Sequence, residues 1–125
     1  MILIFGGAYQ GKLAYTMERF DLTENDVYKC AVEDINMPDN KVIYEIDKWI
    51  LALTKANADI EQAVRQFMDS NGDAVVICND ISCGIVPMDP VSRKWREATG
   101  RALAVLSKNS DEVIRLFCGI PTRIK

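Results

Sequence analysis

Residues Met1 to Lys12 read Met-Ile-Leu-Ile-Phe-Gly-Gly-Ala-Tyr-Gln-Gly-Lys, and the rest of the chain is arranged around this stretch. The apolar run 2–5 is too short for a helix, and Gly6-Gly7 interrupts it, so we expect a strand that ends in a loop. Residues 13–18 follow with side chains typical of a helix. The order is therefore strand, glycine-rich loop and helix.

Within this stretch, Gly6, Gly11 and Lys12 satisfy the spacing G-x-x-x-x-G-K of a phosphate-binding loop. Glycines let backbone N–H groups curve around a phosphate, the helix N-terminus attracts the anion, and the lysine reaches the outer phosphates. A tight β–α turn with a solvated lysine is the alternative that the motif alone leaves open. The predicted nucleotide-binding residues are Gly6, Gly7, Ala8, Tyr9, Gln10, Gly11, Lys12 and Leu13.

The position after the lysine departs from the pattern of a phosphate-binding loop. It is normally Ser or Thr, whose hydroxyl holds Mg²⁺, and here it is Leu13. Thr16 is the nearest hydroxyl on the same helix face, about 5 Å further along the axis, and it could reach the ion only through a water. We therefore expect a loop that binds an anion but lacks the usual protein ligand of Mg²⁺.

Composition narrows the class of protein. The 125 residues are 49% hydrophobic, which predicts a single compact domain over residues 1–125. The net charge of -3 gives no basic surface for nucleic acid or anionic lipid, and no apolar run approaches the roughly 18 residues needed to cross a bilayer. No basic segment precedes the first apolar run, so we expect a cytoplasmic protein.

Four cysteines and the lack of histidine limit the chemistry. None of the cysteines forms a C-x-x-C pair, so no metal site is expected. Cys30, Cys78 and Cys118 lie in apolar, strand-like runs, where a reduced thiol packs as a small hydrophobe, and Cys83 lies in a loop. Because the chain has no imidazole, mechanisms that use a histidine base, nucleophile or phosphoramidate intermediate are excluded.

The rest of the chain alternates between strand-like and helix-like segments. Further strands are expected at residues 27–32, 41–47, 74–78, 113–118 and 122–125. Helices are expected at 48–68, with a break near Asn57 and Asp59, and from Pro90 onward after an N-capping Asp89. The pattern predicts a parallel α/β sheet with flanking helices and an antiparallel edge at the C-terminus. In the last helix the predicted buried side chains are Val91, Trp95, Ala98, Ala102 and Val105.

Ligands of parallel sheets bind beyond the carboxyl ends of the strands. That rule brings the loop 6–12 together with Glu45 or Asp47 and with Asn79-Asp80. A phosphate loop that faces one or two acids is how nucleotide enzymes hold phosphate and its Mg²⁺. Without the loop beside it, each acid would be interpreted first as a solvated charge at a strand end. The candidate catalytic residues are Lys12, Asp80, Glu45 and Asp47.

Further segments support a specific resemblance. They are Asn79-Asp80-Ile81-Ser82-Cys83-Gly84-Ile85-Val86-Pro87, Arg93-x-Trp95-Arg96-Glu97-x-x-Gly100-Arg101, Asp111-Glu112-Val113 and the ending from Gly119 to Lys125. Together with the opening loop Gly6-Gly7-Ala8-x-x-Gly11-Lys12, they resemble the bifunctional adenosylcobinamide kinase / adenosylcobinamide-phosphate guanylyltransferase family.

The resemblance implies a P-loop, RecA-like sheet, usually in a homotrimer, and a role late in cobalamin assembly. Family members phosphorylate the aminopropanol hydroxyl of adenosylcobinamide with ATP or GTP, and then guanylylate the product through a covalent histidine–GMP. By position, the loop 6–12 would hold the nucleotide phosphates. Asp80 takes the place of a family glutamate, and the family's arginines correspond to Arg93, Arg96 and Arg101.

The chain also departs from the family pattern. The family's guanylylated histidine lies in a segment between the second and third strands, where this chain has only the short loop 33–40 and no histidine. Guanylyl transfer by the family route is therefore expected to be lost. Leu13 replaces the family's serine, which weakens the case for the kinase step. The other replacements, whose roles the sequence does not reveal, are Ser82 for glycine and Leu103-Ala104 for Asn-Gln.

Three functions fit these observations. The first is a minimal cobinamide kinase that uses ATP or GTP, in which Lys12 clamps the phosphates and Asp80 or the pair Glu45/Asp47 handles Mg²⁺ or the substrate proton. The second is a module that binds a nucleotide or a corrinoid without turning it over. The third is an oligomer partner of an active homologue, whose interface would involve Trp95. Nucleotide binding is expected, whereas catalytic activity, the preferred nucleotide and the substrate remain open.

Overall fold

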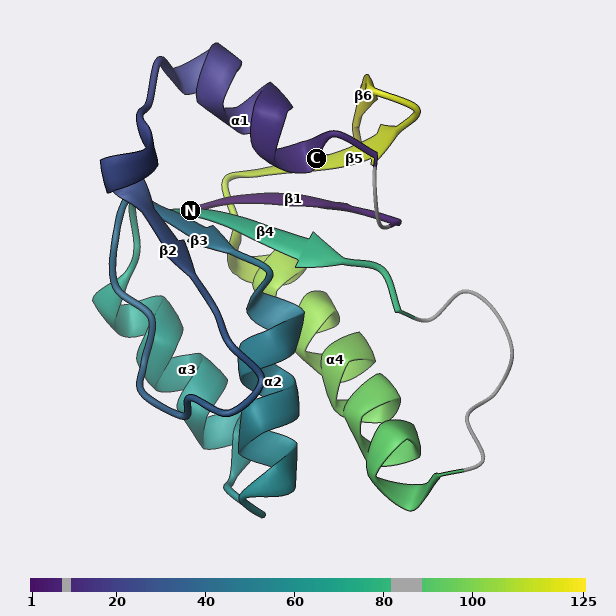
Figure 1. Ribbon diagram of the computed structural model, residues 1–125. Helices are drawn as coiled ribbons and strands as arrows, with labels where there is room; N and C mark the ends of the chain where they lie inside the picture. The colour runs from purple at the N-terminus through teal and green to yellow at the C-terminus, as the bar shows by residue number, and fades with distance from the viewer. Residues whose placement is uncertain (8–9, 82–88) are drawn as a thin grey trace.

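A six-stranded sheet forms the centre of the protein (Figure 1). In this computed structural model the described residues are 1–7, 10–81 and 89–125. The strand order across the sheet is β2-β3-β4-β1-β5-β6. The strands are β1 (Ile2–Gly6), β2 (Val27–Lys29), β3 (Val42–Tyr44), β4 (Val75–Asn79), β5 (Glu112–Phe117) and β6 (Ile120–Arg123).

The direction of the strands follows the sequence-based expectation. Strands β1 to β5 are parallel to their neighbours, and β6 runs antiparallel to β5. In the middle of the sheet, Leu3 is in register with Val76 on one side and with Val113 on the other. The predicted α/β class, with a mostly parallel sheet and an antiparallel C-terminal edge, is confirmed.

The helices cover the two faces of the sheet unequally, as Figure 1 shows. Helix α1 (Lys12–Phe20) lies on one face, while α2 (Ile46–Lys55), α3 (Ile60–Ser70) and α4 (Pro90–Asn109) lie on the other. A short 3₁₀ helix, Glu24–Asp26, precedes β2. Helix α1 follows β1 on one face, and α4 follows β4 on the other. The chain therefore leaves these two neighbouring strands in opposite directions at their carboxyl ends, which is where ligands bind in such folds.

Local sequence explains where the helices begin. The Asp89 carboxylate accepts hydrogen bonds from the N–H groups of Val91 and Ser92, and Pro90 occupies the first helical position of α4. The Asp59 carboxylate accepts from the N–H of Gln62 and caps α3 in the same way. The predicted break between two helices therefore lies between Lys55 and Ile60.

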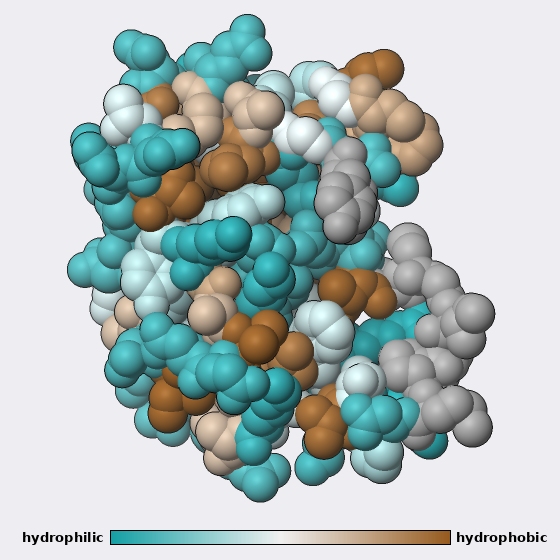
Figure 2. Space-filling model, viewed as in Figure 1, coloured by the Kyte–Doolittle hydropathy of each residue, from teal (hydrophilic) through white to brown (hydrophobic). Residues whose placement is uncertain are grey.

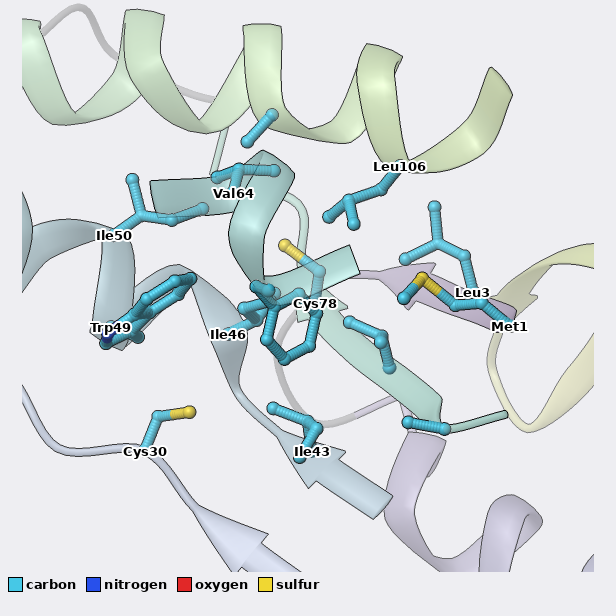
Figure 3. Packing of buried hydrophobic residues seen from close by; sticks show 14 of the residues in the cluster. Met1, Leu3, Cys30, Ile43, Ile46, Trp49, Ile50, Val64, Cys78 and Leu106 are labelled. Carbon is cyan, nitrogen blue, oxygen red and sulfur yellow. The ribbon is translucent and has the colours of Figure 1, made fainter. Parts of the chain in front are cut away.

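The larger part of the core lies between the sheet and helices α2 to α4 (Figure 3). Leu3, Ile43 and Cys78 reach it from the strands, and Trp49 packs against Phe67 with their ring centroids 5.6 Å apart. Burial of such side chains is the main stabilising contribution, at about 1.5–3 kcal/mol for each large apolar side chain.

A smaller core lies beneath α1 on the opposite face. Period-two alternation sends Ile4 of β1 and Ile77 of β4 to this face, while their neighbours in sequence point to the larger core. Leu13 and Phe20 of α1 pack against this cluster. Figure 2 shows hydrophobic surface between α1 and the strands below it, because one helix covers only part of this face.

Two predicted strands end earlier than the sequence suggested. The strand expected at 27–32 stops at Lys29, and a turn follows in which the Asp34 N–H donates to the Ala31 carbonyl. The strand expected at 41–47 stops at Tyr44, because Glu45 adopts a left-handed conformation with φ of 59° and α2 begins at Ile46. Glu45 and Asp47 therefore lie at the start of a helix, and the prediction that both end a strand is wrong.

Other boundaries also differ. In α4, Val91 is 40% exposed, so its predicted burial is wrong, and Leu106 and Thr99 are buried instead. The strand expected at 113–118 ends at Phe117, and Cys118 is exposed in a turn, so the prediction that it packs as a core residue is also wrong. Among the described helices, none has both the length and the apolar character needed to cross a membrane.

Candidate functional site

The glycine loop connects β1 to α1 at the carboxyl edge of the sheet. Gly6 must be glycine, since a Cβ atom at this position would lie 2.3 Å from the backbone oxygen of Leu116 in β5. Gly11 has φ of 82°, a conformation that L side chains rarely adopt, and directly precedes α1. The N–H groups in the first turn of α1 point toward the loop, as they do at the start of every helix. No side chain in the described part of the chain accepts a hydrogen bond from them as a cap. Ala8 and Tyr9 are outside the described residues.

Lys12 is buried in this loop and is only 5% exposed. Its ammonium Nζ donates a hydrogen bond of 2.6 Å to the carbonyl oxygen of Gly7. Burial lowers the pKa of Lys12, and the nearby carboxylates of Asp47 and Glu45 partly oppose this shift. The alternative of a solvated lysine is therefore wrong. Lys12 faces both the loop and the two acids.

The residues next to Lys12 in α1 offer no open hydroxyl. Leu13 is half-buried and packs on the core beneath α1. The hydroxyl of Thr16 is buried and donates to the carbonyl oxygen of Lys12 at 2.8 Å. Thr16 is therefore occupied within its own helix and does not replace the missing Ser or Thr after the lysine.

Glu45 and Asp47 are held together by Asn79, the last residue of β4. The Asn79 N–H donates to Asp47 Oδ1 at 3.0 Å, and the Asn79 side-chain amide donates to Glu45 Oε2 at 3.2 Å and to Asp47 Oδ2 at 3.4 Å. Lys48 forms an ion pair of 2.9 Å with Glu45. The two candidate acids are thus fixed side by side at the end of the central strands.

Burial is the main influence on the carboxyl group of Asp47. Asp47 is 2% exposed, and burial raises the pKa of its carboxyl group. The hydrogen bonds from Asn79 act in the opposite direction, and the negative charge of Glu45 raises the pKa further. Trp95 of α4 donates its indole N–H to the Asp47 carbonyl oxygen at 2.8 Å, which ties this turn of α2 to α4.

Asp80 follows Asn79 and lies next to the end of β1. Its N–H donates to the carbonyl oxygen of Gly6 at 2.8 Å, so Asp80 is bound directly to the first residue of the loop. Asp80 also lines a cavity of about 240 Å³ on the α4 side of the sheet. The hydroxyl of Thr99, which is 1% exposed, borders this cavity and has no hydrogen-bond partner in the part of the chain that the structure describes. The lining residues are Phe5, Asp80, Ile81, Arg96, Thr99, Gly100 and Leu103.

The three candidate arginines do not converge on one site. Arg96 lines the cavity with Asp80, whereas Arg101 lines a separate groove between α3 and α4. Arg93 is exposed near the start of α4. The structure therefore brings together Lys12, Glu45, Asp47 and Asp80 around the ends of β1 and β4, and it adds only Arg96 from the arginine group.

Sequence reasoning gave no role to several residues that build this site. The sequence places Asn79 beside Asp80 but does not predict that it bridges two carboxylates, because that role depends on strand register. Trp95 is expected from the sequence in the core or at an interface, and in the structure it packs against the core and also donates to the backbone oxygen of Asp47. Leu103 and Ala104, whose roles the sequence does not reveal, lie on different surfaces. Leu103 lines the cavity with Asp80, and Ala104 lines the groove between α3 and α4. Ser82 and Cys83 lie outside the described residues.

The thiols near the site are inert. Cys30 and Cys78 are buried and free. Burial raises the pKa of Cys30 to about 12 and raises that of Cys78 well above its usual value. Neither thiol is therefore a nucleophile at neutral pH.

Within the described residues, no group of three or more Cys, Asp and Glu side chains is arranged to hold a metal ion.

Comparison with protein families gives one match. The family described as cobinamide kinase / cobinamide phosphate guanyltransferase matches residues 28–124, which is most of the chain. The chain belongs to this family. The resemblance read from the motifs of the sequence is thereby confirmed, together with a P-loop-type α/β fold. A comparison with curated proteins gave no match.

Membership in the cobinamide kinase / cobinamide phosphate guanyltransferase family connects the chain to cobalamin biosynthesis. The substrates of this family are a nucleotide, ATP or GTP, and a corrinoid. The matched residues contain Glu45, Asp47, Asn79 and Asp80, whereas the glycine loop precedes them. The family match therefore does not include the glycine loop.

Proposed function

We propose that this protein binds the triphosphate of ATP or GTP on the loop 6–13 and performs only the kinase half of the family's chemistry. The observation that supports this most directly is the position of Lys12. A buried ammonium group costs free energy unless a partner compensates it, and here it lies between the Gly7 carbonyl oxygen and two carboxylates. A bound nucleotide phosphate would take the place of the Gly7 carbonyl as the hydrogen-bond partner of the Lys12 ammonium group, and a charged acceptor binds an ammonium group more strongly than a neutral one.

The acids across from Lys12 fit the Mg²⁺ that accompanies a nucleoside triphosphate. Carboxylate oxygens are ligands that Mg²⁺ prefers, and the ion usually keeps several of its waters. Glu45 and Asp47 would hold it through such waters, because their oxygens already accept hydrogen bonds from Asn79. In phosphoryl transfer, the ion neutralises charge on the phosphates.

The lack of histidine removes the second half of the family's reaction. Guanylyl transfer in the family uses a covalent histidine–GMP, and this chain has no histidine. Phosphoryl transfer needs mainly positioning and charge stabilisation. Lys12 would orient the phosphates, and Asp80, whose N–H is bound to the Gly6 carbonyl oxygen, would accept the proton of the corrinoid hydroxyl.

A second function, binding without turnover, is favoured by the surroundings of Leu13. The hydroxyl that normally holds Mg²⁺ is missing, and Thr16 donates its own hydroxyl to the Lys12 carbonyl oxygen. Such a protein would hold a nucleotide, or act as an oligomer partner of an active homologue. The trimer, the cytoplasmic location and the single-domain organisation stay predictions.

Calorimetry with ATP and with GTP, each with and without Mg²⁺, tests the proposal. We expect micromolar binding of at least one nucleotide, together with phosphorylation of cobinamide and no transfer of GMP. Tight binding with no phosphorylated product would support the second function instead. If neither nucleotide binds, the kinase and the binding module are both contradicted, and only the oligomer partner is left.

Replacing Leu13 with serine should increase cobinamide phosphorylation. The new hydroxyl would stand where phosphate-binding loops hold Mg²⁺, and a preorganised polar group of this kind contributes about 10²-fold to turnover. We expect at least a tenfold increase in kcat, measured below the unfolding temperature, because the loss of the Leu13 side chain also costs roughly 1–2 kcal/mol of stability.

Ala14→Ser is the matched control for this variant. Ala14 is the exposed neighbour of Leu13 in the first turn of α1, so this change adds a hydroxyl to the same turn at a position that does not face the phosphates. Its kcat should stay within about twofold of the unaltered protein, since surface substitutions usually change little. An unchanged kcat in Leu13→Ser would show that the missing hydroxyl does not limit turnover.

A further inference from the structure

The turn between β5 and β6 has two backbone N–H groups directed away from its own hairpin. Cys118 and Gly119 have φ of 51° and 74°, and they connect Phe117 to Ile120, which pair across the hairpin. Two consecutive left-handed residues are typical of a type I′ turn. The N–H groups of its two central residues take no part in the strand ladder, so they need partners elsewhere.

Both of these N–H groups are bound by Gln10 of the glycine loop. The Cys118 N–H donates to the side-chain oxygen Oε1 of Gln10. The Gly119 N–H donates to the backbone oxygen of Gln10 at 3.2 Å. Gln10 directly precedes Gly11, whose φ of 82° turns the chain into α1. The hairpin therefore fixes the residue that sets the direction of the loop into Lys12.

The same hairpin also contacts the start of the loop. The backbone oxygen of Leu116 in β5 occupies the space where a side chain of Gly6 would lie. Strand β5 and its turn thus meet the loop at Gly6 and again at Gln10. The tip of the hairpin is visible beside the carboxyl end of β1 in Figure 1, and part of its surface is hydrophobic in Figure 2.

From this arrangement we infer that the β5–β6 turn is a support of the phosphate loop, and that Gln10 is the positioning residue through which it acts. The inference rests on the proposed nucleotide binding by the loop. A glycine-rich loop loses much conformational freedom when it closes on a phosphate. Two hydrogen bonds from the turn to Gln10 restrict the empty loop beforehand, and preorganisation of this kind raises affinity.

The conformation of Cys118 agrees with this role. A left-handed conformation is unfavourable for a residue with a Cβ atom, and such residues persist where surrounding contacts fix the backbone. Among the described residues with a side chain, only Asp21, Glu45, Asn57 and Cys118 have positive φ. In Cys118, this strained backbone presents its N–H group to Gln10.

Gln10→Met tests the inference, because methionine has a similar length and no amide oxygen. In the protein without nucleotide, amide exchange measured by NMR should be at least tenfold faster at Cys118, whose partner is the lost side-chain oxygen, and should change less at Gly119, whose partner is the backbone oxygen of residue 10. The affinity for ATP should fall about five- to tenfold, and the affinity for inorganic tripolyphosphate by the same factor, because Gln10 acts on the phosphate-binding part alone. The unfolding temperature should change by less than about 2 °C, since the lost bond is at the surface.

Two further variants separate positioning from general destabilisation. Gln10→Glu keeps an oxygen acceptor in the side chain. Amide exchange at Cys118 should therefore be as slow in this variant as in the unaltered protein, in contrast to Gln10→Met. Thr122→Ala changes an exposed residue of β6 that pairs with Arg115 in the same hairpin, and it should leave both amide exchange at the turn and ATP affinity within about twofold.

The outcomes are distinct. Faster exchange together with weaker binding of ATP and tripolyphosphate supports the inference. Unchanged exchange in Gln10→Met, or faster exchange with unchanged affinity, overturns it. If the unaltered protein binds neither ATP nor tripolyphosphate, the proposed function is wrong and the inference is wrong with it. If the unaltered protein binds both and Gln10→Met binds them equally well, only the inference is wrong.

Discussion

Replacing Lys12 with methionine should weaken the binding of ATP and GTP by about 10- to 100-fold. A hydrogen bond to a charged group contributes roughly 1.5–3 kcal/mol, and each 1.4 kcal/mol corresponds to a factor of ten in affinity. Methionine fills a similar volume, and burial already lowers the pKa of the Lys12 ammonium. The variant should therefore be at least as stable as the unaltered protein, so that calorimetry reports lost phosphate contacts and not unfolding.

Lys55→Met is a control that removes the same charge elsewhere. Lys55 ends α2 and pairs with Glu33 at the surface, at 3.0 Å. Because an exposed ion pair contributes little, this variant should bind nucleotide within about twofold of the original affinity. Equal affinity of Lys12→Met and the unaltered protein would show that the loop does not hold the phosphates.

Gly6→Ala should destabilise the fold by about 3 kcal/mol, since overpacking of a buried position costs roughly 1–3 kcal/mol or more. The added methyl group would lie 2.3 Å from the Leu116 oxygen, a backbone atom that cannot rotate away. Relief requires the ends of β1 and β5 to separate, which would also move the Asp80 N–H that donates to the Gly6 carbonyl oxygen. The unfolding temperature should fall by roughly 10 °C, measured by calorimetry and by urea unfolding.

Gly7→Ala is the comparison for this change, because the next glycine has more space. The nearest atom to a Cβ at Gly7 is the Gln10 Cγ at 3.8 Å, an ordinary contact. Its free energy of unfolding should differ from that of the original protein by less than about 1 kcal/mol. Similar stability of Gly6→Ala and Gly7→Ala would contradict the close approach of β1 and β5.

Local signals in the sequence predicted much of the fold. The apolar residues of β4, the Asp89 cap with Pro90, and the strand, loop and helix order around Gly6 all depend on neighbouring residues, and all are present. The end of β3 was missed for a physical reason. The alternation of side chains continues through Glu45, and the strand stops there because this glutamate takes a left-handed conformation, for which composition gives no signal.

The candidate site was predicted less completely because its contacts join distant segments. The strand-end rule brought Lys12, Asp47 and Asp80 to one edge, and their placement agrees with it. The bridging role of Asn79, the bond from Trp95 to Asp47, and the contact of Gln10 with the β5–β6 turn depend on register and on partners far along the chain. Periodicity carries no information on such pairs.

The position of Gly6 also has a consequence for biosynthesis. Its neighbours across the sheet are Asn79 of β4 and Leu116 of β5, so a nascent chain on the ribosome exposes the whole glycine loop long before β5 emerges. Contacts between segments so far apart in sequence form slowly. The growing polypeptide should therefore remain unable to retain a nucleotide until β5 has been translated, although the glycine loop itself is made much earlier.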